Sequence, residues 1–252
     1  MKLTSLLCGA AIVLALAAVP AQAQVLKNGA TPTGVPFNFL DPKTNTMRGF
    51  LLDIAAEVAK RGKLQFDLQT LDFQSLVPAL ESKRIDIITS SFAITEQRAK
   101  VVDFAVPLYS FYCGLLVPQG NPKKLVTYDD VKKVKVGTNM GNNIIASARQ
   151  NGIEFELYST IQDLVRDLNL GRIDAAIVDM PIVDQMMKDK PEYKFEWVKD
   201  FKPFSKDYYS FAVRKGDGAL LDKINPILTE IKKDGTLQTL IKQWGLSVDI
   251  AP

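Results

Sequence analysis

Two polar residues, Ser91 and Asp179, end matching stretches of the sequence and are the first candidates for a functional site. The stretch 73–91 (FQSLVPALESKRIDIITSS) aligns without a gap with 161–179 (IQDLVRDLNLGRIDAAIVD). In each copy, apolar residues at i, i+3, i+4 and i+7 predict an amphipathic helix, and the apolar run at the shared Arg-Ile-Asp predicts a buried strand. Each polar residue therefore follows the carboxyl end of a strand, where open α/β sheets bind their ligands.

The repeat has two interpretations. Helix–turn–strand units look alike in many α/β proteins, so similarity of this kind arises without a common organisation. The Arg-Ile-Asp triplet at a fixed offset favours two related lobes, in which Ser91 and Asp179 lie opposite each other across a cleft.

The composition favours binding over catalysis. The sequence has no histidine, which excludes Ser-His-Asp and Cys-His nucleophile systems, His-based zinc motifs and histidine acid–base chemistry. Carboxylate, lysine and tyrosine chemistry remain open. The formal net charge is +3, and it is +2 without residues 1–23, whose one charged residue is Lys2. So small an excess gives no indication of nucleic-acid or membrane-surface binding.

Residues 1–23 have the pattern of a cleavable signal peptide. Lys2 precedes the apolar run Leu6–Val19, and the sequence AQA at 21–23 forms an A-x-A cleavage site. The expected mature chain starts at Gln24 and is exported to the periplasm, and no later segment approaches the length of a membrane span. Cys113 is then the one cysteine left, so no intrachain disulfide is expected and its thiol is assigned to the core.

Helices and strands alternate along the rest of the chain, which predicts the α/β class. Strands are expected at 25–30, 64–70, 85–88, 134–138, 175–178 and 208–213, and helices at 49–60, 73–80, 126–133, 144–149, 161–168, 180–189, 220–235 and 236–246, with a further helix from Thr95. The expected first lobe comprises 24–116 and a return segment, 210–252, and the second lobe comprises 117–209. We expect the chain to cross between lobes near Leu115–Pro118 and Tyr209–Val213.

These motifs, taken in order, resemble the extracellular solute-binding proteins of the amino-acid type, family 3, which serve ABC importers. The matching pieces cover nearly the whole mature chain: GVPFNF, GFLLDIAAEVAKR, LDFQSLVPALESKRIDIITSSFAITEQRAKVVDFAVPLY, VKVGTNMG, GRIDAAIVD and LTEIKKDGTLQTLIKQWG. The resemblance implies a type II periplasmic-binding-protein fold, in which each of two lobes is a sheet flanked by helices and the ligand cleft lies between them. It implies binding of an amino acid or related small zwitterion by hinge closure, with an ABC permease of the inner membrane as partner. No cofactor, metal or nucleic acid is expected, and the family is usually monomeric.

The resemblance assigns the two charged ends of the ligand to Arg98 and Asp179. The family's arginine follows an I-T-x-x-R motif, here ITEQR at 94–98, and a planar guanidinium binds a carboxylate through two parallel hydrogen bonds. The alternative for Arg98 is a solvated helix arginine. Asp179 matches the acid that binds the α-ammonium, since a carboxylate accepts from the three ammonium donors. Its alternative is the N-cap of the helix that follows.

Further contacts are implied for Phe73, Ser91, Gly141 and Asn142. Phe73 matches an aromatic residue that stacks on the ligand, although it also begins the apolar stripe of its helix. Ser91 matches a residue whose backbone carbonyl accepts from the ammonium. Gly141 and Asn142 are expected at the start of a helix, whose free N–H groups attract an anion and help Arg98 hold the carboxylate.

Several positions depart from the family's pattern, among them Met140-Gly141, which replaces a commoner Gly/Thr-rich pair. Ala93 stands where a serine or threonine often donates to the carboxylate, and Thr31 and Gly34 stand where many members have an acid and an aromatic residue in the entry loop. The missing acid argues against a strongly cationic ligand such as lysine or arginine. The missing aromatic residue leaves a larger or wetter pocket.

Two other functions use the same scaffold. A periplasmic enzyme resembling the cyclohexadienyl dehydratases requires a general acid in the cleft, but Asp179 is followed by MPIV at 180–183, without the additional carboxylic acid expected there. A solute sensor needs the same cleft as a transport receptor, so only its signalling partner distinguishes it. Binding for transport, without catalysis, is the favoured function.

Overall fold

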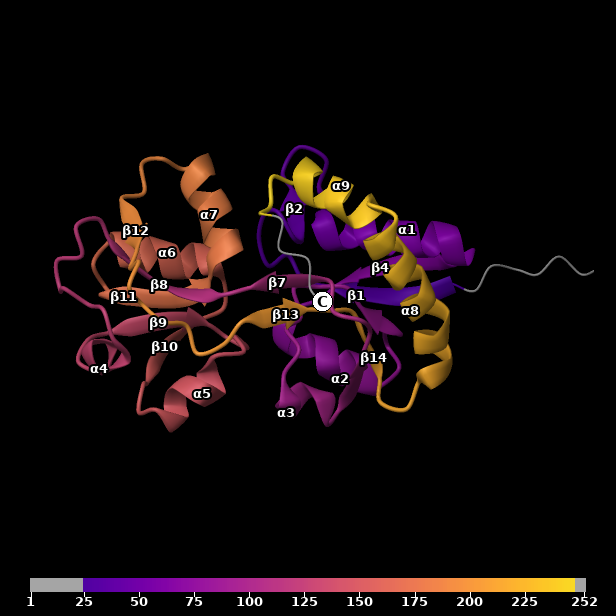
Figure 1. The fold of residues 1–252 in the computed structure, drawn as a ribbon, viewed down its shortest axis with the longest axis horizontal. Coiled ribbons are helices and arrows are strands. Elements are labelled where there is room, and N and C mark those ends of the chain that lie inside the picture. Colours follow the sequence, from indigo (N-terminus) through magenta and orange to yellow (C-terminus); the bar gives the residue numbers. More distant parts are fainter. Residues whose placement is uncertain (1–24, 248–252) are drawn as a thin grey trace, which may run out of the picture.

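The computed structural model describes residues 25–247, so the expected signal peptide at 1–23 lies outside the described residues. The chain forms two lobes, each built on a five-stranded sheet with helices packed against it (Figure 1). This arrangement confirms the expected α/β class and the two-lobed fold.

The first lobe contains both ends of the described chain. Its sheet comprises β1 (Val25–Ala30), β4 (Gln65–Thr70), β5 (Ile87–Ile88), β6 (Val102–Phe104) and β14 (Ala212–Arg214). Its other elements are the hairpin β2 (Phe39–Asp41) and β3 (Thr46–Arg48), the 3-10 helix η1 (Phe73–Ser75), and the helices α1 (Phe50–Gly62), α2 (Leu76–Glu81), α3 (Glu96–Ala99), α8 (Gly218–Lys233) and α9 (Thr236–Gln243).

The second lobe is formed by the middle of the chain. Its sheet comprises β8 (Cys113–Pro118), β9 (Val136–Asn139), β10 (Phe155–Tyr158), β11 (Ala175–Asp179) and β12 (Phe195–Trp197). Its helices are α4 (Tyr128–Val131), α5 (Ile145–Gln150), α6 (Ile161–Asn169) and α7 (Met180–Asp189).

The two sheets have the same strand order and the same strand directions. The first lobe has the order β4-β1-β5-β14-β6, and the second has β10-β9-β11-β8-β12. The first three strands of each sheet are parallel, and β14 and β8 run antiparallel to both neighbours. Strands β5 and β11, which end the two copies of the sequence repeat, therefore occupy equivalent places.

The repeated aspartate fastens each helix–turn–strand unit to the neighbouring strand. Asp86 Oδ2 accepts from the N–H of Lys27 at 2.9 Å, and Asp174 Oδ2 accepts from the N–H of Lys135 at 3.0 Å. Each aspartate also donates its own N–H to the carbonyl of the same lysine. The shared Arg-Ile-Asp therefore marks the point where each unit is joined to its sheet.

The repeated isoleucine packs against a glycine of the same neighbouring strand. A Cβ on Gly29 would overlap Ile85 Cδ1, and a Cβ on Gly137 would lie 2.7 Å from Ile173 Cδ1. Both isoleucines are buried. Equivalent packing at both places supports the interpretation of the repeat as two related lobes.

The first copy of the repeat is less regular than the second. Its expected helix consists of η1 followed by α2, and its strand β5 has two residues. In the second copy, α6 begins after Thr160, whose hydroxyl accepts from the N–H of Asp163 at 3.1 Å. Asp72 stands at the equivalent N-cap of the first copy, and its side chain makes no capping hydrogen bond.

Two short antiparallel strands, β7 (Tyr109–Phe111) and β13 (Asp207–Tyr209), lie between the lobes (Figure 1). The expected crossing at Leu115–Pro118 is wrong, because β8 pairs only with strands of the second-lobe sheet. The expected lobe boundary therefore lies too late in the chain. The second crossing, expected at Tyr209–Val213, is β13 and the residues that follow it, since β14 already belongs to the first-lobe sheet.

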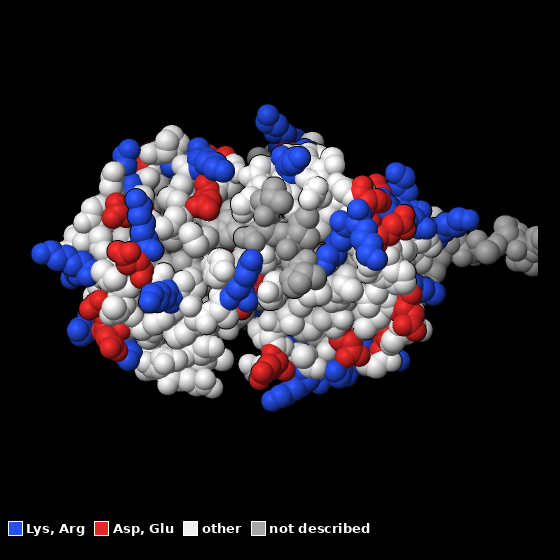
Figure 2. Space-filling view, viewed as in Figure 1, with Lys and Arg blue, Asp and Glu red and all other residues white. Residues whose placement is uncertain are grey.

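Three further features concern the surface charges, the buried cysteine and the length of the helices. Figure 2 shows Lys and Arg side chains interspersed with Asp and Glu over both lobes on the face in view. Cys113 is buried, as expected. Between residues 25 and 247, no helix combines the length and the apolar character needed to cross a membrane.

We expect Asp86→Ala and Asp174→Ala each to lower the free energy of unfolding by about 0.5–1.5 kcal/mol, because each removes the hydrogen bond that joins the repeat unit to the backbone N–H of Lys27 or Lys135. Urea unfolding followed by circular dichroism measures the change. Asp129→Ala is the control, since its side chain is 79% exposed and pairs with Lys132 on the surface of α4. A cost at the repeat positions no larger than the control's would contradict this account of the repeat.

Candidate functional site

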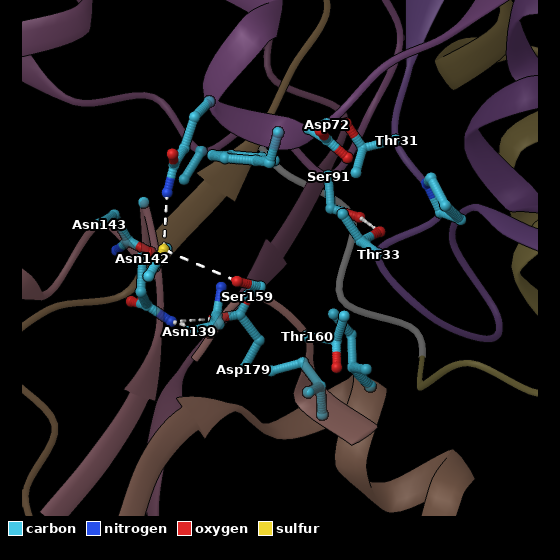
Figure 3. Close-up of a pocket in the computed structure, with 18 of the residues that line it drawn as sticks. Thr31, Thr33, Asp72, Ser91, Asn139, Asn142, Asn143, Ser159, Thr160 and Asp179 are labelled. Atoms are coloured by element: carbon cyan, nitrogen blue, oxygen red, sulfur yellow. Dashed lines mark hydrogen bonds between the residues drawn. The ribbon is translucent and has the colours of Figure 1, made fainter. Parts of the chain in front are cut away.

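A cavity of about 290 Å³ lies between the two lobes. The first lobe lines it with Thr31, Pro32, Thr33, Asp72, Phe73, Gln74, Ser91, Ala93 and Arg98. The second lobe lines it with Asn139, Met140, Gly141, Asn142, Asn143, Ser159, Thr160, Ile161, Gln162, Asp179 and Ile182. Figure 3 shows the labelled first-lobe residues on one side and the labelled second-lobe residues on the other.

Of the nine residues expected at the site, all but Gly34 line this cavity. Gly34 is not among the lining residues; it closes a turn, with its N–H donating to the carbonyl of Asn38 at 2.8 Å. A Cβ on Gly34 would lie 2.8 Å from Ile182 Cγ2. Gly34 therefore packs behind Ile182, and Ile182 itself forms the wall.

The sequence repeat indicates cavity residues that the family motifs did not. Phe73 and Gln74 begin the first copy, Ile161 and Gln162 begin the second, and Asp72 and Thr160 directly precede them; all six residues line the cavity. They have the same offset of 88 residues that relates Ser91 to Asp179. Of these six residues only Phe73 was expected at the site, so the repeat was the missed signal.

Other lining residues follow from no pattern in the sequence. They lie at a strand end, in irregular segments or on a helix start, and their approach to the cavity depends on how the lobes are packed: Pro32, Thr33, Asn139, Met140, Asn143, Ser159 and Ile182.

Arg98 is held between the lobes by two backbone carbonyls. Its Nη1 donates to Ala93 O at 2.8 Å in the first lobe, and its Nη2 donates to Gly141 O at 2.6 Å in the second. The guanidinium also lies over the rings of Phe92 and Phe73, at 4.3 and 5.2 Å from the centroids. Because a guanidinium has five N–H donors, Arg98 retains donors for a ligand and is not a solvated helix arginine.

The environment of Arg98 leaves it charged but partly desolvated. Burial lowers its pKa to about 10, while the negative charge of Asp179 acts in the opposite direction. The Thr95 hydroxyl accepts from the N–H of Arg98 at 3.1 Å and begins α3. A ligand carboxylate beside this guanidinium would stabilise its charged form.

Asp179 ends β11 with a buried carboxylate, the residue being 9% exposed. Its Oδ1 accepts from Asn142 Nδ2 at 3.0 Å and from Cys113 Sγ at 3.3 Å, and its Oδ2 accepts from the Tyr209 hydroxyl. The residue occupies the N-cap position of α7, but its side chain makes no capping hydrogen bond. The carboxylate therefore faces the hydrogen-bond network at the cavity rather than the helix.

Burial is the largest influence on the pKa of Asp179 and raises it. The hydrogen bonds from Tyr209, Cys113 and Asn142 lower this pKa, and the negative charge of Asp207 raises it. None of the three donors is a cation. An ammonium group placed in the cavity next to Asp179 would supply the opposite charge that the buried carboxylate lacks.

The turn containing Gly141 and Asn142 does not act as a helix N-terminus. Helix α5 begins only after this turn, and the N–H of Asn142 donates to Asn139 O at 3.0 Å. The Asn142 amide donates to Asn139 Oδ1 and to Asp179 Oδ1. The expectation that N–H groups at a helix start hold the carboxylate is therefore wrong for Asn142, and Gly141 contributes a carbonyl instead.

The lobes touch along one side of the cavity. A Cβ on Gly141, whose φ is +78°, would lie 2.7 Å from Phe73 Cδ1. Next to it, Gln74 Nε2 donates to Met140 Sδ at 2.8 Å, and Ser159 Oγ donates to the same sulfur at 3.9 Å. Phe73 and Gln74 of the first lobe therefore meet the turn after β9 of the second.

Hydroxyl groups and one acid form the opposite wall. The Oγ1 of Thr33 and the Oγ of Ser91 are 2.8 Å apart (Figure 3). The Thr31 hydroxyl donates to Leu71 O at 2.8 Å. Asp72 lies beside Thr31 on this wall. The argument from Thr31 against a cationic ligand does not hold, because Asp72 places a carboxylate in the same region.

The lining has the charges of a site for a small zwitterion. Arg98 is its positive side chain, Asp72 and Asp179 are its negative ones, and the remaining lining residues are uncharged. Across the described range 25–247, no cluster of three or more His, Cys, Asp or Glu side chains is arranged to hold a metal ion.

Comparison with known proteins agrees with this geometry. The bacterial extracellular solute-binding proteins, family 3, match residues 26–247. The L-cystine-binding protein of Escherichia coli is 32% identical over 219 residues, 86% of this chain and 80% of that protein. The lysine/arginine/ornithine-binding periplasmic protein of the same organism is 32% identical over 231 residues, 88% of this chain and 87% of that one.

A solved structure shows the same fold with a ligand. An ancestral arginine-binding protein bound to glutamine has a TM-score of 0.80 and 31% identity, covering 88% of this chain and 98% of its own. A family match over nearly the whole described chain, together with these relatives, shows that the protein belongs to the bacterial extracellular solute-binding proteins of family 3.

Proposed function

We propose that this protein is a periplasmic receptor that binds an α-amino acid or a related small zwitterion and delivers it to an ABC permease. The observation that carries the proposal is the pair of opposite charges, Arg98 on the first lobe and Asp179 on the second, lining one cavity between the lobes. The ligand carboxylate takes the remaining donors of Arg98, and its ammonium binds Asp179. Contacts to both lobes make the ligand favour the closed arrangement.

The side chain of the ligand is proposed to be polar. Relatives are named for cystine and for lysine, arginine and ornithine, and the ancestral protein is bound to glutamine. Beyond Arg98 and Asp179, hydroxyl and amide groups with Asp72 make up most of the polar lining here. A polar side chain satisfies these groups, whereas an apolar one leaves them without partners.

Three further features complete the proposal. The expected signal peptide at 1–23 and the family's extracellular placement support a periplasmic protein. The strands β7 and β13 are proposed as the hinge, since they lie between the lobes. The receptor is proposed to act as a monomer, as the family usually does. It is proposed to act without turnover, because Asp179 is already bound by three donors and residues 180–183 contain no additional acid.

A thermal-shift screen of residues 24–252 against amino acids, opines, polyamines and small organic acids tests this function. A ligand at a hundred times its Kd adds about 2.7 kcal/mol of stability, which is about 5–10 °C for a chain of this size. We expect the largest shifts with polar α-amino acids. A flat response to every α-amino acid contradicts the proposal, and consumption of prephenate or arogenate indicates the dehydratase alternative instead.

Arg98→Ala and Asp179→Asn are expected to weaken the best ligand of that screen by at least about thirtyfold, corresponding to about 2 kcal/mol. Each change leaves one charged end of the ligand without its partner. Isothermal titration calorimetry measures the loss. Arg166→Ala is the control, because the Arg166 side chain is 60% exposed on α6. Equal affinity of all three variants contradicts the assignment of Arg98 and Asp179 to the two charged ends of the ligand.

Gly141→Ala is expected to weaken ligand binding because the added Cβ meets Phe73 when the lobes close. Gly171→Ala is a matched control, since Gly171 also has a positive φ (+68°) but nothing lies within 4 Å of its Cβ position. Both changes place alanine in a left-handed conformation and cost about 1–2 kcal/mol of stability. Calorimetry should show a loss of affinity for Gly141→Ala alone; an equal loss in both variants argues against contact at closure.

A further inference from the structure

Tyr209 is fully buried at the end of β13, the strand that returns from the second lobe to the first. Its ring stacks on Phe111 of β7, with the centroids 4.0 Å and the planes 18° apart. It also meets Phe37 in an edge contact, with the centroids 5.0 Å apart. These contacts fix the ring, so the direction of its hydroxyl is set by the core.

The backbone of Tyr209 is bonded to the first lobe. It forms an antiparallel bridge with Ala93, and its carbonyl accepts from the N–H of Leu108 at 2.9 Å. Ala93 is the residue whose carbonyl binds Arg98. Tyr209 is therefore attached to the segment that positions the positive charge of the cavity.

The hydroxyl of Tyr209 reaches in the other direction and donates to Asp179 Oδ2. The other carboxylate oxygen accepts from Asn142 and Cys113, which both belong to the second lobe. Among these three donors, Tyr209 is the one that comes from outside the second-lobe sheet and its loops. One side chain thus connects the backbone beside Arg98 to the carboxylate of Asp179.

We propose that Tyr209 is a positioning residue, whose hydroxyl holds the Asp179 carboxylate in the orientation that receives the ligand's ammonium and ties it to the strand crossing between the lobes. The inference rests on the proposed function, because it requires an ammonium ligand at Asp179. Without the hydroxyl, Oδ2 loses its donor, and the buried carboxylate turns toward whichever donors remain.

The groups around Asp179 set the direction of the effect of pH. On β13, Tyr209 donates to it and Asp207 repels its charge; on β8, the Cys113 thiol donates; from the first lobe, Arg98 attracts it. Burial raises the pKa of Asp179, and the Tyr209 hydrogen bond lowers it. Removing the hydroxyl raises this pKa further. On acidification, the ionised carboxylate and the ammonium binding that depends on it are then lost at a higher pH.

The test is Tyr209→Phe, which keeps the stacked ring and removes the hydroxyl. The test titrates the protein calorimetrically with the α-amino acid found by the screen and repeats the titration from neutral to acidic pH. It gives the affinity and the pH at which affinity is lost on acidification, here called the acid limb. We expect binding about ten- to a hundredfold weaker at neutral pH, as for a lost hydrogen bond to a charged group. The acid limb should move to higher pH.

Tyr158→Phe is the matched control. The Tyr158 hydroxyl also donates to a carboxylate, Asp167 Oδ2, at 3.2 Å, but this pair lies outside the cavity lining. Its affinity and acid limb should equal those of the unaltered protein. A second variant carries 4-aminophenylalanine in place of Tyr209. This residue retains a donor at the same position, so it should fold and should recover most of the binding.

The outcomes separate the inference from the proposed function. If Tyr209→Phe binds as tightly as Tyr158→Phe with the same acid limb, the inference is overturned while the function stands. If Tyr209→Phe does not fold, weak binding by the 4-aminophenylalanine protein, which keeps a donor at the same position, overturns the inference equally. If Asp179→Asn binds as tightly as the unaltered protein, the proposed function itself fails.

Discussion

The buried carboxylate of Asp179 is the constraint on which the arrangement of the site depends. A charge in such a position is stable only when both oxygens are hydrogen-bonded. Its donors come from three distant places in the chain: the turn after β9, the start of β8 and the strand between the lobes. Satisfying one side chain therefore fixes a second-lobe turn, the entry into the second-lobe sheet and the crossing strand relative to one another.

The two lobes present the same frame with different chemistry. Each contributes the end of, or the loop after, the equivalent strand β1 or β9 (31–33 and 139–143), the start of its repeat helix (72–74 and 160–162), and the residue that ends its repeat (Ser91 and Asp179). The Arg-Ile-Asp unit holds that frame in each lobe. Because the frame is shared, a difference in residue type at equivalent places gives the two lobes different chemistry. The hydroxyl of Ser91 in the first lobe corresponds to the carboxylate of Asp179 in the second.

The local patterns predicted most helices and the central strands, because they report burial of one helix face or of a strand; the short strands β2, β3, β6, β10 and β12 were not expected. Apolar spacing predicts the helices α1, α6, α8 and α9, and the repeat predicts that the two lobes share one topology. The lobe boundary was wrong because the run 107–117 is apolar throughout: β7 between the lobes and β8 within the second sheet are both buried, so no change in composition marks the end of one and the start of the other.

The sequence predicted those site residues that stand at the start of a helix or at the end of a strand. Arg98 and Asp179 follow motifs at a helix start and a strand end, and both line the cavity. Gly34 lies outside the lining and the N–H of Asn142 is already bonded, because local hydrogen bonds close each turn: Gly34 N–H to Asn38 O and Asn142 N–H to Asn139 O. Tyr209 carries no signal in the sequence beyond strand alternation, since its role comes from where its hydroxyl points after the lobes are joined.

The hydrogen bonds of Arg98 indicate how a ligand selects the closed arrangement. The guanidinium is already bound to carbonyls of both lobes, so contact between the lobes does not wait for a ligand. A carbonyl carries only a partial negative charge, whereas a carboxylate carries a full one and binds two N–H groups in parallel. The proposed zwitterion would therefore add a charge-assisted pair at Arg98 and, through its ammonium, a cation in direct contact with the buried carboxylate of Asp179. These two interactions form together only when both lobes contact the same ligand. They therefore stabilise the closed state relative to the open state, and this difference in free energy drives closure.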